Sequence, residues 1–216
     1  MHSMRLLTVF ALSSLLVAAV GVAGVEVFPP TCERIECAEF VVIGEGNGYE
    51  IRRYDSAVWM STSPIDDISL VNATRTGFFQ LFDYIQGKNE YGETIEMTGP
   101  VMSQISPSDG PFCKSSFVVS FSVPKKNQAN PPPAEGLHVQ KWQSKFLAVR
   151  QFGGFVSDDT IGQQADALFS SLTGSNWASA IDPSGAYAVA QYNSPFEFSG
   201  RVNEVWITLD LHASAM

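Results

Sequence analysis

Apolar residues recur at helical spacing along the stretch from Leu70 to Gly87. On a wheel of about 3.6 residues per turn, most of them fall in one sector, whereas Phe79 and Tyr84 fall outside it. The positions of this sector are Val71, Thr74, Phe78, Leu81, Phe82 and Ile85. Ser69 suits the N-cap, because its hydroxyl can accept from a free first-turn amide, and Gly87 suits the left-handed position after the helix. The pattern predicts an amphipathic helix that lies against a sheet.

Runs of β-branched and aromatic residues on both sides of this helix predict strands. Residues 49–63 form either two strands or one bent strand with a bulge near Asp55 and Ser56. Residues 41–43 predict a short edge strand. Further strands are expected at residues 94–97, 101–105, 117–123, 137–152, 187–192 and 202–209. A second helix is expected within residues 157–174, with an apolar face formed by Ile161, Ala165, Leu168, Phe169 and Leu172.

The second half of the chain repeats the order of the first half. Residues 137–152 resemble residues 49–63 at an offset of about 88 positions, and the apolar ends of the two predicted helices also match. In the same internal alignment, Glu204 falls near Glu96. Two copies of a strand–helix–strand–strand unit are the simplest interpretation of this order.

The two copies cover about residues 49–123 and 137–210, and together they predict a single domain over residues 25–216. Strands joined by short turns pair antiparallel, and two such sheets can close or half-close into a barrel. The expected fold class is therefore α+β, an antiparallel β-barrel with two flanking helices.

The N-terminus has the pattern of a secretory signal peptide. Arg5 precedes an apolar run that ends in small residues, and cleavage is expected near Ala23 or Gly24. The alternative is a signal anchor, although the serines, glycines and alanines of the run make it weak as a permanent span. We assign residues 1–24 to the signal peptide and expect the mature chain in the secretory pathway, outside the cell or in an endomembrane or vacuolar lumen. No later stretch of the sequence is long and apolar enough to span a membrane.

The charge of the chain excludes one class of partner. The formal net charge is −9, and removing residues 1–24 takes away Arg5 and no acidic residue, which gives −10. A chain of this charge is not suited to nucleic acid or to anionic membrane surfaces.

The cysteines are Cys32, Cys37 and Cys113. Thiols on a secretory route tend to oxidise, so the simplest expectation is one disulfide and one free thiol, with the pairing left open. Three cysteines without a nearby histidine do not predict a metal site. Asn72, followed by Ala73 and Thr74, forms the one N-x-S/T sequon of the sequence, and its occupancy is open.

Several motifs occur together in a fixed order: GYEIRRY, TGFFQLFDYIQGKN, IEMTGPV, SDGPF, a PPP connector, RQFGGF, YNSPF and NEVWI. In these motifs the chain resembles the SOUL haem-binding protein family, in its secreted or endomembrane branch, over about residues 30–210. The resemblance implies a distorted antiparallel β-barrel built from two related halves. It also implies non-covalent binding of haem and related tetrapyrroles, as a carrier or buffer without enzymatic activity.

The resemblance places the ligand in an apolar groove between the first helix and the loop before the last strand. The matching positions are Phe78, Leu81, Phe82, Ile85, Phe196, Phe198 and Arg201. Aromatic faces could stack on a macrocycle, and Arg201 could meet a propionate. The alternative for the helix positions is ordinary core packing. For Phe196 and Phe198 it is a cap over the barrel end, and for Arg201 it is a solvated charge.

No histidine matches an axial ligand proposed for the family. His2 leaves with the signal peptide, His212 lies near the C-terminus, and His138 lies on a predicted strand away from the matched helix. Met97 and Met102 are better explained as core residues. We therefore expect a porphyrin site without a strong iron bond, and metal-free porphyrin should bind comparably.

Two other functions remain open at this point. The fold resembles GyrI-like effector-binding domains, some of which hydrolyse small lipophilic compounds, and Glu204 would then be the base. A groove that takes an apolar peptide is the third hypothesis. Glu204 could equally be a structural carboxylate.

Overall fold

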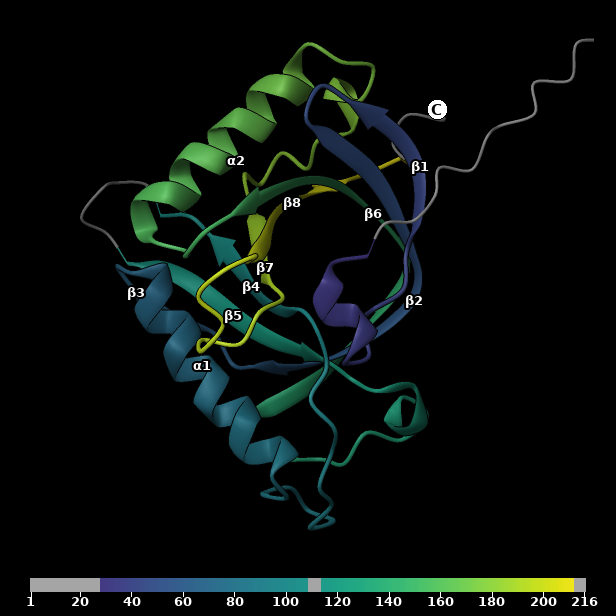
Figure 1. Ribbon diagram of the computed structural model, residues 1–216, viewed down its shortest axis with the longest axis vertical. Helices are drawn as coiled ribbons and strands as arrows, with labels where there is room; N and C mark the ends of the chain where they lie inside the picture. Colours follow the sequence, from purple (N-terminus) through teal and green to yellow (C-terminus); the bar gives the residue numbers. More distant parts are fainter. Residues whose placement is uncertain (1–27, 109–113, 212–216) are drawn as a thin grey trace, which may run out of the picture.

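The structure, a computed structural model, describes residues 28–108 and 114–211 (Figure 1). The strands are β1 (Val41–Gly46), β2 (Tyr49–Thr62), β3 (Ile65–Asp67), β4 (Val101–Ser106), β5 (Ser115–Ser122), β6 (Leu137–Gly153), β7 (Tyr187–Gln191) and β8 (Val202–Leu209). The α-helices are α1 (Leu70–Ile85) and α2 (Asp158–Thr173). Short 3-10 helices occur at Pro30–Glu33, Lys125–Asn127 and Ala178–Ala180.

Antiparallel strands close into a barrel in the order β2, β6, β8, β7, β4 and β5, and β5 pairs again with β2. Strand β1 pairs with β2 outside this ring, and β3 pairs with β5. Both helices lie on the outside of the barrel (Figure 1). The predicted α+β barrel with two flanking helices is confirmed, and residues 41–43 belong to an outer strand as expected.

The two halves follow the predicted order, with β2, α1, β4 and β5 in the first and β6, α2, β7 and β8 in the second. The strand expected at residues 94–97 is wrong, because only Thr94 forms an isolated bridge, with Gln86. This segment follows the end of α1: the Ile95 amide donates to Ile85 O at 2.8 Å, and the Ile95 side chain is buried. The segment therefore runs as a loop.

Strand β2 settles the choice between two strands and one bent strand. It is continuous from Tyr49 to Thr62. Its pairing with β6 skips Asp55 and the opposite Ser144. Ser144 has a φ of 49°, in the left-handed region, so the backbone of β6 is irregular at this point. The pairing is interrupted at Asp55, but the register is the same on both sides, so the bulge predicted near Asp55 and Ser56 is wrong.

Helix α1 packs through a different line of residues from the one predicted. Tyr84, expected outside the apolar face, is buried, whereas Val71 and Phe82 are 43% and 39% exposed. Gly77 explains the rotation, since a Cβ there would come within 2.5 Å of the Val119 side chain on β5. The helix approaches the barrel most closely along its small residues. The helical wheel placed the packing face along the large apolar residues instead, and so missed this line.

Helix α2 packs as predicted. Ala165, Leu168 and Leu172 are buried against β6 and β8, and Phe169 is partly buried beside them. Ile161, also buried, packs in a separate cluster with Leu70 and Ala73 of α1. Both predicted ends of α1 are also confirmed, since Ser69 is an N-cap that accepts from the Asn72 amide and Gly87 has a φ of 99°. Ser157, where the interval expected for the second helix begins, is the N-cap of α2 and accepts from the Thr160 amide.

The interior of the barrel is aromatic. Trp59 and Trp206 are fully buried there, and Trp142 packs on both, with ring centroids 5.1 and 6.4 Å away. Tyr54 packs edge-on against Trp142 at 5.7 Å. These rings fill most of the space that the six strands enclose.

The segment before β1 is closed into a loop by a disulfide between Cys32 and Cys37, and hydrogen bonds between this segment and Gly99 hold it against the residues before β4. Cys37 also forms an isolated bridge with Gly99. The pairing left open in the sequence is thus Cys32 with Cys37. Cys113 and the signal peptide predicted at residues 1–24 lie outside the described residues. Among the described helices, none combines the length and apolar character that a membrane span requires.

Candidate functional site

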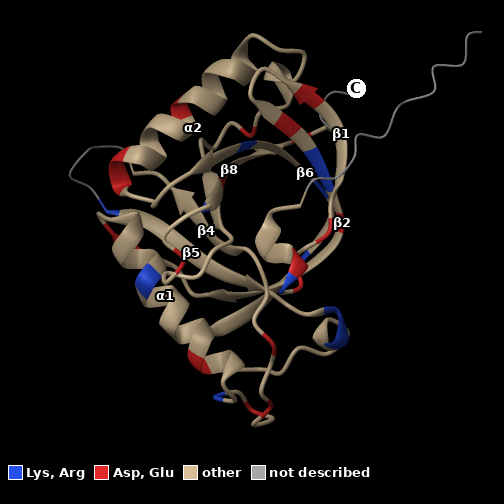
Figure 2. Ribbon diagram, in the orientation of Figure 1, with Lys and Arg blue, Asp and Glu red and all other residues tan. Residues whose placement is uncertain are grey.

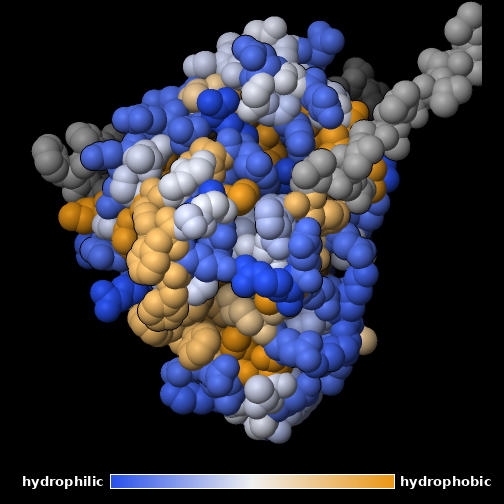
Figure 3. Space-filling view, viewed as in Figure 1, coloured by the Kyte–Doolittle hydropathy of each residue, from blue (hydrophilic) through white to orange (hydrophobic). Residues whose placement is uncertain are grey.

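Large aromatic side chains are exposed on one face of the molecule. Phe196 and Phe198, in the loop between β7 and β8, are 84% and 78% exposed, and Phe79 on α1 is 56% exposed. Figure 3 shows apolar residues gathered along α1 on this face. Contiguous exposed apolar surface of this kind typically marks a binding site. We call the following set the aromatic surface: Phe78, Phe79, Phe82, Phe155, Phe196 and Phe198.

The helix part of the aromatic surface is anchored in the core through Phe78. Its ring is half-buried and packs against Phe121 of β5, with centroids 5.4 Å apart. On its outer side it stacks with Phe82 at 5.8 Å and an interplanar angle of 15°. Phe79 lies beside it, with centroids 5.9 Å apart. One buried ring therefore supports two exposed rings.

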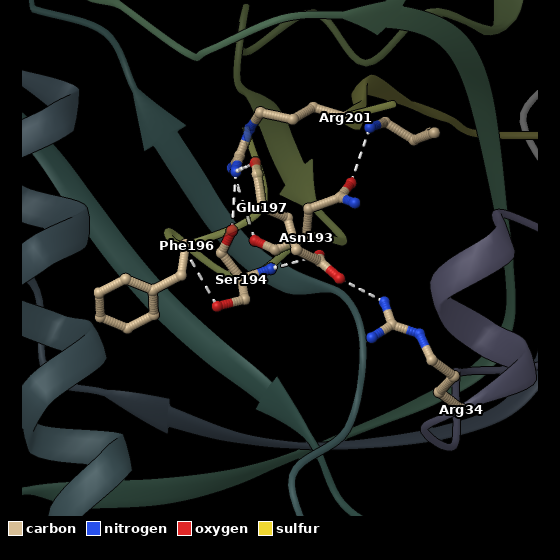
Figure 4. Close-up of polar contacts among 7 residues, drawn as sticks. Arg34, Asn193, Ser194, Phe196, Glu197 and Arg201 are labelled. Carbon is tan, nitrogen blue, oxygen red and sulfur yellow. Dashed lines mark hydrogen bonds and ion pairs between the residues drawn. The ribbon is translucent and has the colours of Figure 1, made fainter. Parts of the chain in front are cut away.

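The loop part is held by hydrogen bonds that begin at Arg201. Its Nη1 donates to the carbonyls of Ser194 and Glu197, at 2.7 and 2.8 Å (Figure 4). The Ser194 amide donates to the Glu197 carboxylate at 3.0 Å, and the Asn193 side chain accepts from the Val202 amide at 2.8 Å. These hydrogen bonds fix the conformation of the loop, in which Phe196 and Phe198 are exposed to solvent.

The same loop is tied to the segment before β1. Glu197 forms an ion pair with Arg34 (Figure 4), which follows the first 3-10 helix and lies between Cys32 and Cys37. The Arg34 hydrogen bond, together with that of Asn193, lowers the pKa of the Glu197 carboxyl. In Figure 4 the Phe196 ring points away from this tether and toward α1. The loop thus faces the helix part of the aromatic surface.

The structure divides the predicted site residues into two groups. Phe82, Phe196 and Phe198 are exposed, and Phe78 is half-buried. Leu81 and Ile85 are 0% and 4% exposed and pack between α1 and the barrel, so the core alternative describes them. A binding role for the exposed group stays a prediction.

Arg201 lies apart from both groups, because it is only 8% exposed. Its guanidinium donates to loop carbonyls and lies 4.4 Å from the ring centroid of Phe155. These contacts within the protein account for the position of Arg201 without a bound propionate. The exposed cation beside the aromatic surface is Arg75, whose guanidinium carbon is 6.0 Å from the Phe79 centroid.

Sequence reasoning missed Phe79, Phe155 and Arg75. Phe79 was placed outside the apolar sector of the helix, and an aromatic residue outside the packing face was itself a sign of exposure. Phe155 follows Gly153 and Gly154 in the RQFGGF run, and its ring lies 6.2 Å from that of Phe198. A bulky ring after a Gly-Gly pair signals a loop.

The candidate iron ligands do not lie on the aromatic surface. His138 is exposed on β6, with its Nε2 3.5 Å from the Gln140 amide nitrogen. Met97 packs in the core beneath α1, and Met102 is buried inside the barrel. Among the described residues, no group of three or more His, Cys, Asp or Glu could hold a metal ion.

Glu204 lies inside the barrel and is 0% exposed. Its carboxylate accepts from Arg52 Nη1 at 3.1 Å, Tyr192 Oη at 3.0 Å and Trp206 Nε1 at 2.8 Å. Burial, and then the facing carboxylate, raise the pKa of Tyr192 well above its ordinary value. Burial lowers the pKa of Arg52, but Glu204 acting together with Tyr54, Tyr192 and Glu50 outweighs this and leaves it raised. Glu204 is therefore the anion of a buried network.

The proposed equivalence of Glu204 with Glu96 is wrong. Glu96 lies in the loop after α1, its side chain is 77% exposed, and it pairs with Lys126 at 3.3 Å. The two residues differ because only the second half of the chain places its glutamate on a strand inside the barrel.

Comparison with known proteins agrees with this fold and these motifs. Residues 35–208 match the family described as SOUL heme-binding protein. "Heme-binding protein 2" of Homo sapiens is 38% identical over 161 residues, which cover 74% of this chain and 77% of that protein. "Heme-binding protein 1" of Sus scrofa is 29% identical over 154 residues, which cover 70% of this chain and 77% of that protein.

Among solved structures, the C-terminal domain of EcmrR superimposes with a TM-score of 0.51 at 8% identity, over 74% of this chain and 96% of that chain. At that identity the likeness concerns the fold alone. The sequence matches are different in kind, because they span most of both chains and include the motifs that build α1 and the loop before β8. The chain therefore belongs to the SOUL heme-binding protein family.

Proposed function

We propose that the chain binds haem or a related porphyrin non-covalently on the aromatic surface, as a carrier or buffer. Family membership gives the ligand class, because the named relatives are heme-binding proteins. One observation carries the placement of the ligand: Phe196 and Phe198 are almost fully exposed by a loop that hydrogen bonds hold in shape. A flat macrocycle is the kind of ligand that would cover such rings.

The magnitudes agree with reversible binding. Covering about 300 Å² of a porphyrin and a similar area of protein contributes roughly 15 kcal/mol. Lost translational and rotational freedom and the ordering of side chains remove about half of this. The remaining ~8 kcal/mol corresponds to a micromolar dissociation constant. No bond to iron is needed to reach it.

Arg75 is the residue we propose for a propionate. It is exposed on α1 beside Phe79, and a guanidinium can bind a carboxylate through two hydrogen bonds. Since this contact is solvent-exposed, its contribution should fall as salt is added. Arg75→Gln should weaken porphyrin binding several-fold at low salt and less at high salt.

The experiment is a titration of residues 25–216 with haemin and, separately, with metal-free protoporphyrin, followed by the Soret band and tryptophan fluorescence. We expect saturable binding of both ligands with similar dissociation constants. Phe196→Ser combined with Phe198→Ser should weaken both at least tenfold, because each ring loses an apolar contact. Ile43→Ser on β1 is the matched control, since Ile43 is also exposed, at 37%, on an outer strand away from α1.

Tight binding of haemin alone would contradict the absence of an iron ligand. Unchanged affinity in the double variant would remove the loop from the site. Binding of neither ligand would overturn the proposed function.

The hydrolase hypothesis gains no support from the position of Glu204. A general base needs a free lone pair within reach of its substrate. The Glu204 oxygens already accept from several buried donors, and Glu204 lines neither the cavity bounded by Trp142 and Lys145 nor the one bounded by Glu50 and Arg52. A binding role is the better supported function.

We also propose that the chain enters the secretory pathway. The Cys32–Cys37 disulfide supports this, because such bonds persist in oxidising compartments. Expression of the full chain in a eukaryotic cell should yield a product that begins near residue 25, as read by N-terminal sequencing. An intact N-terminus would contradict cleavage, and a shift after glycosidase treatment would report occupancy of Asn72.

A further inference from the structure

One end of the barrel opens into a cavity of about 280 Å³ that the proposed porphyrin site does not use. Its walls come from β4, β6, β7 and β8 and from the loop between α2 and β7. Small-molecule sites in proteins range from roughly 300 to 1,000 Å³, so this mouth cavity suits a ligand of one or two rings. A four-ring macrocycle is too large for it.

The lining of the mouth cavity is mixed, with more polar than apolar surface open to solvent. Its aromatic members are Trp142 and Trp206, whose ring centroids lie 6.4 Å apart in an edge-to-face arrangement, and Trp142 is the more exposed of the two. Trp59 packs behind both tryptophans, and its buried indole Nε1 has no hydrogen-bond partner within the described residues. The aromatic part of this lining favours a flat ring.

The rim carries one cation in an unusual position. Lys145 follows Ser144, where the backbone of β6 is irregular, and its ammonium is 4.8 Å from the ring centroid of Trp142. It is partly removed from water, and Asp182, across the mouth, is the acidic group of the described residues that acts on it electrostatically. Asp182 itself already accepts from the Ser184 amide at 2.9 Å. Lys145 is thus the rim charge better placed to gain from a new counter-ion.

We propose that the mouth cavity binds a small aromatic carboxylate, with its ring against Trp142 and Trp206 and its carboxylate at Lys145. The ring packs on the accessible face of Trp142 and displaces water from it. The carboxylate adds a second anion, besides Asp182, to the surroundings of the partly desolvated Lys145 ammonium. This site is separate from the aromatic surface, so an experiment can refute one of the two proposed sites without refuting the other.

The test uses three probes that share a phenylpropyl skeleton and differ in charge: 3-phenylpropionate, 3-phenylpropionamide and 3-phenylpropylamine. Binding to residues 25–216 is measured by calorimetry and by tryptophan fluorescence, which reports on the mouth because both Trp142 and Trp206 line it. The carboxylate should bind at least tenfold more tightly than the amine. Tighter binding of the amine, or no binding of the carboxylate, would overturn the proposal.

Two variants and a control locate the site. Lys145→Met keeps the aliphatic stem and should weaken the carboxylate about tenfold while leaving the amide unchanged. Lys141→Met is the matched control, because Lys141 is an exposed lysine on the same strand outside the cavity lining. Ala186→Trp should fill the mouth and weaken all three probes.

The porphyrin site provides the cross-check. Phe196→Ser with Phe198→Ser should leave the carboxylate affinity unchanged, and Lys145→Met should leave porphyrin affinity unchanged. Loss of carboxylate binding in the phenylalanine double variant would place that ligand on the aromatic surface and overturn the proposal.

Discussion

Glu96 and Glu204 carry the same side chain, and the comparison of the two halves aligned them, yet their surroundings give them opposite properties. Glu96 is exposed and pairs with Lys126 in solvent. Glu204 is sealed inside the barrel with Arg52, Tyr192 and Trp206. A sequence can identify a carboxylate on a strand, but the partners that fix its role come from strands far away in the chain.

Replacing Glu204 by Gln should destabilise the fold by about 3 kcal/mol, because the change removes the buried counter-ion of Arg52 and leaves it only the part-exposed carboxylate of Glu50. Urea or guanidinium unfolding measures this. Glu96→Gln is the matched control and should stay within about 0.5 kcal/mol of the parent. Equal effects of the two variants would show that the buried pair contributes nothing special.

Two buried tyrosines should respond to alkaline pH. Burial, reinforced by the Glu204 carboxylate, raises the pKa of Tyr54 and of Tyr192 above their ordinary value. A phenol whose pKa is raised in the folded state stabilises the fold fully below its unfolded value of about 10. That contribution is lost as the pH rises through the folded value, so unfolding should become easier above about pH 10.

Absorbance at 295 nm during an alkaline titration measures this response. Exposed tyrosines should ionise first, and Tyr54 and Tyr192 should ionise only as the barrel unfolds. Tyr192→Phe should reduce the late step. Ionisation of all tyrosines in one step before unfolding would contradict the assignment.

At the scale of elements, the two helices meet at their N-termini, and one residue serves both. Asp158 begins α2, and its carboxylate accepts from the Ser69 hydroxyl at 2.7 Å and from the Val71 amide at 3.2 Å at the start of α1. Figure 2 shows this acidic start of α2 next to α1. Both N-termini carry partial positive charge, so a shared carboxylate stabilises their approach.

Asp158→Ala should therefore destabilise the protein by about 1–2 kcal/mol, the range of a lost helix cap with an added electrostatic contribution. Asp159→Ala, the neighbouring change in the same helical turn, should cost only a few tenths of a kcal/mol. Thermal unfolding of both variants tests the difference. A larger effect at Asp159 would contradict the shared-cap interpretation.

The tether between the disulfide segment and the loop gives a second prediction at this scale, which rests on the proposed porphyrin site. Arg34 lies between Cys32 and Cys37 and pairs with Glu197 in the loop that presents Phe196. Replacing both cysteines by Ser should free Arg34 and weaken porphyrin binding about threefold. Arg34→Gln should do the same, and combining the changes should add little, because both act through one contact. If the losses of affinity were additive, the cysteine changes and Arg34→Gln would not both act through the Arg34–Glu197 contact.

The elements themselves were largely predictable from local chemistry. Ser69, Ser157 and Gly87 act at the helix ends within a few residues of their own position, and the predicted ends are correct. The packing face of α1 was not predictable in the same way, since Gly77 marks the closest contact only because Val119 of β5 lies opposite. Local signals fix where an element begins and ends, and distant partners fix how it turns.

The same division applies to the candidate site. Phe196 and Phe198 were named through the family resemblance, and the flanking Pro195 and Gly200 are typical of the exposed loop in which the structure places them. Arg201 was assigned to a ligand because its partners, the carbonyls of its own loop, are visible only once the loop is folded. The mouth cavity could not be predicted at all, because four strands and a distant loop must come together to form it.

At the scale of the whole molecule, the structure separates two kinds of surface. The aromatic surface is on the outside, on α1 and the loop before β8, and the mouth cavity is at the end of the barrel. A network of buried charges around Glu204 occupies the interior. The barrel thus supports both proposed binding sites, the aromatic surface on its outside and the mouth cavity at its end.

The two hydrogen-bonded ladders on either side of β2 differ in length, and this affects how the barrel opens locally. Strand β2 pairs with β6 along nearly its whole length, from Glu50 to Thr62, but with β5 only from Trp59 to Ser61. Local opening should therefore begin where the ladder is shortest. The amides of Val119 and Val123, which donate to Thr62 and Val58 of β2, should exchange with deuterium before those of Leu147–Val149, a difference that NMR can follow. Uniform protection would mean that the ring opens only by global unfolding.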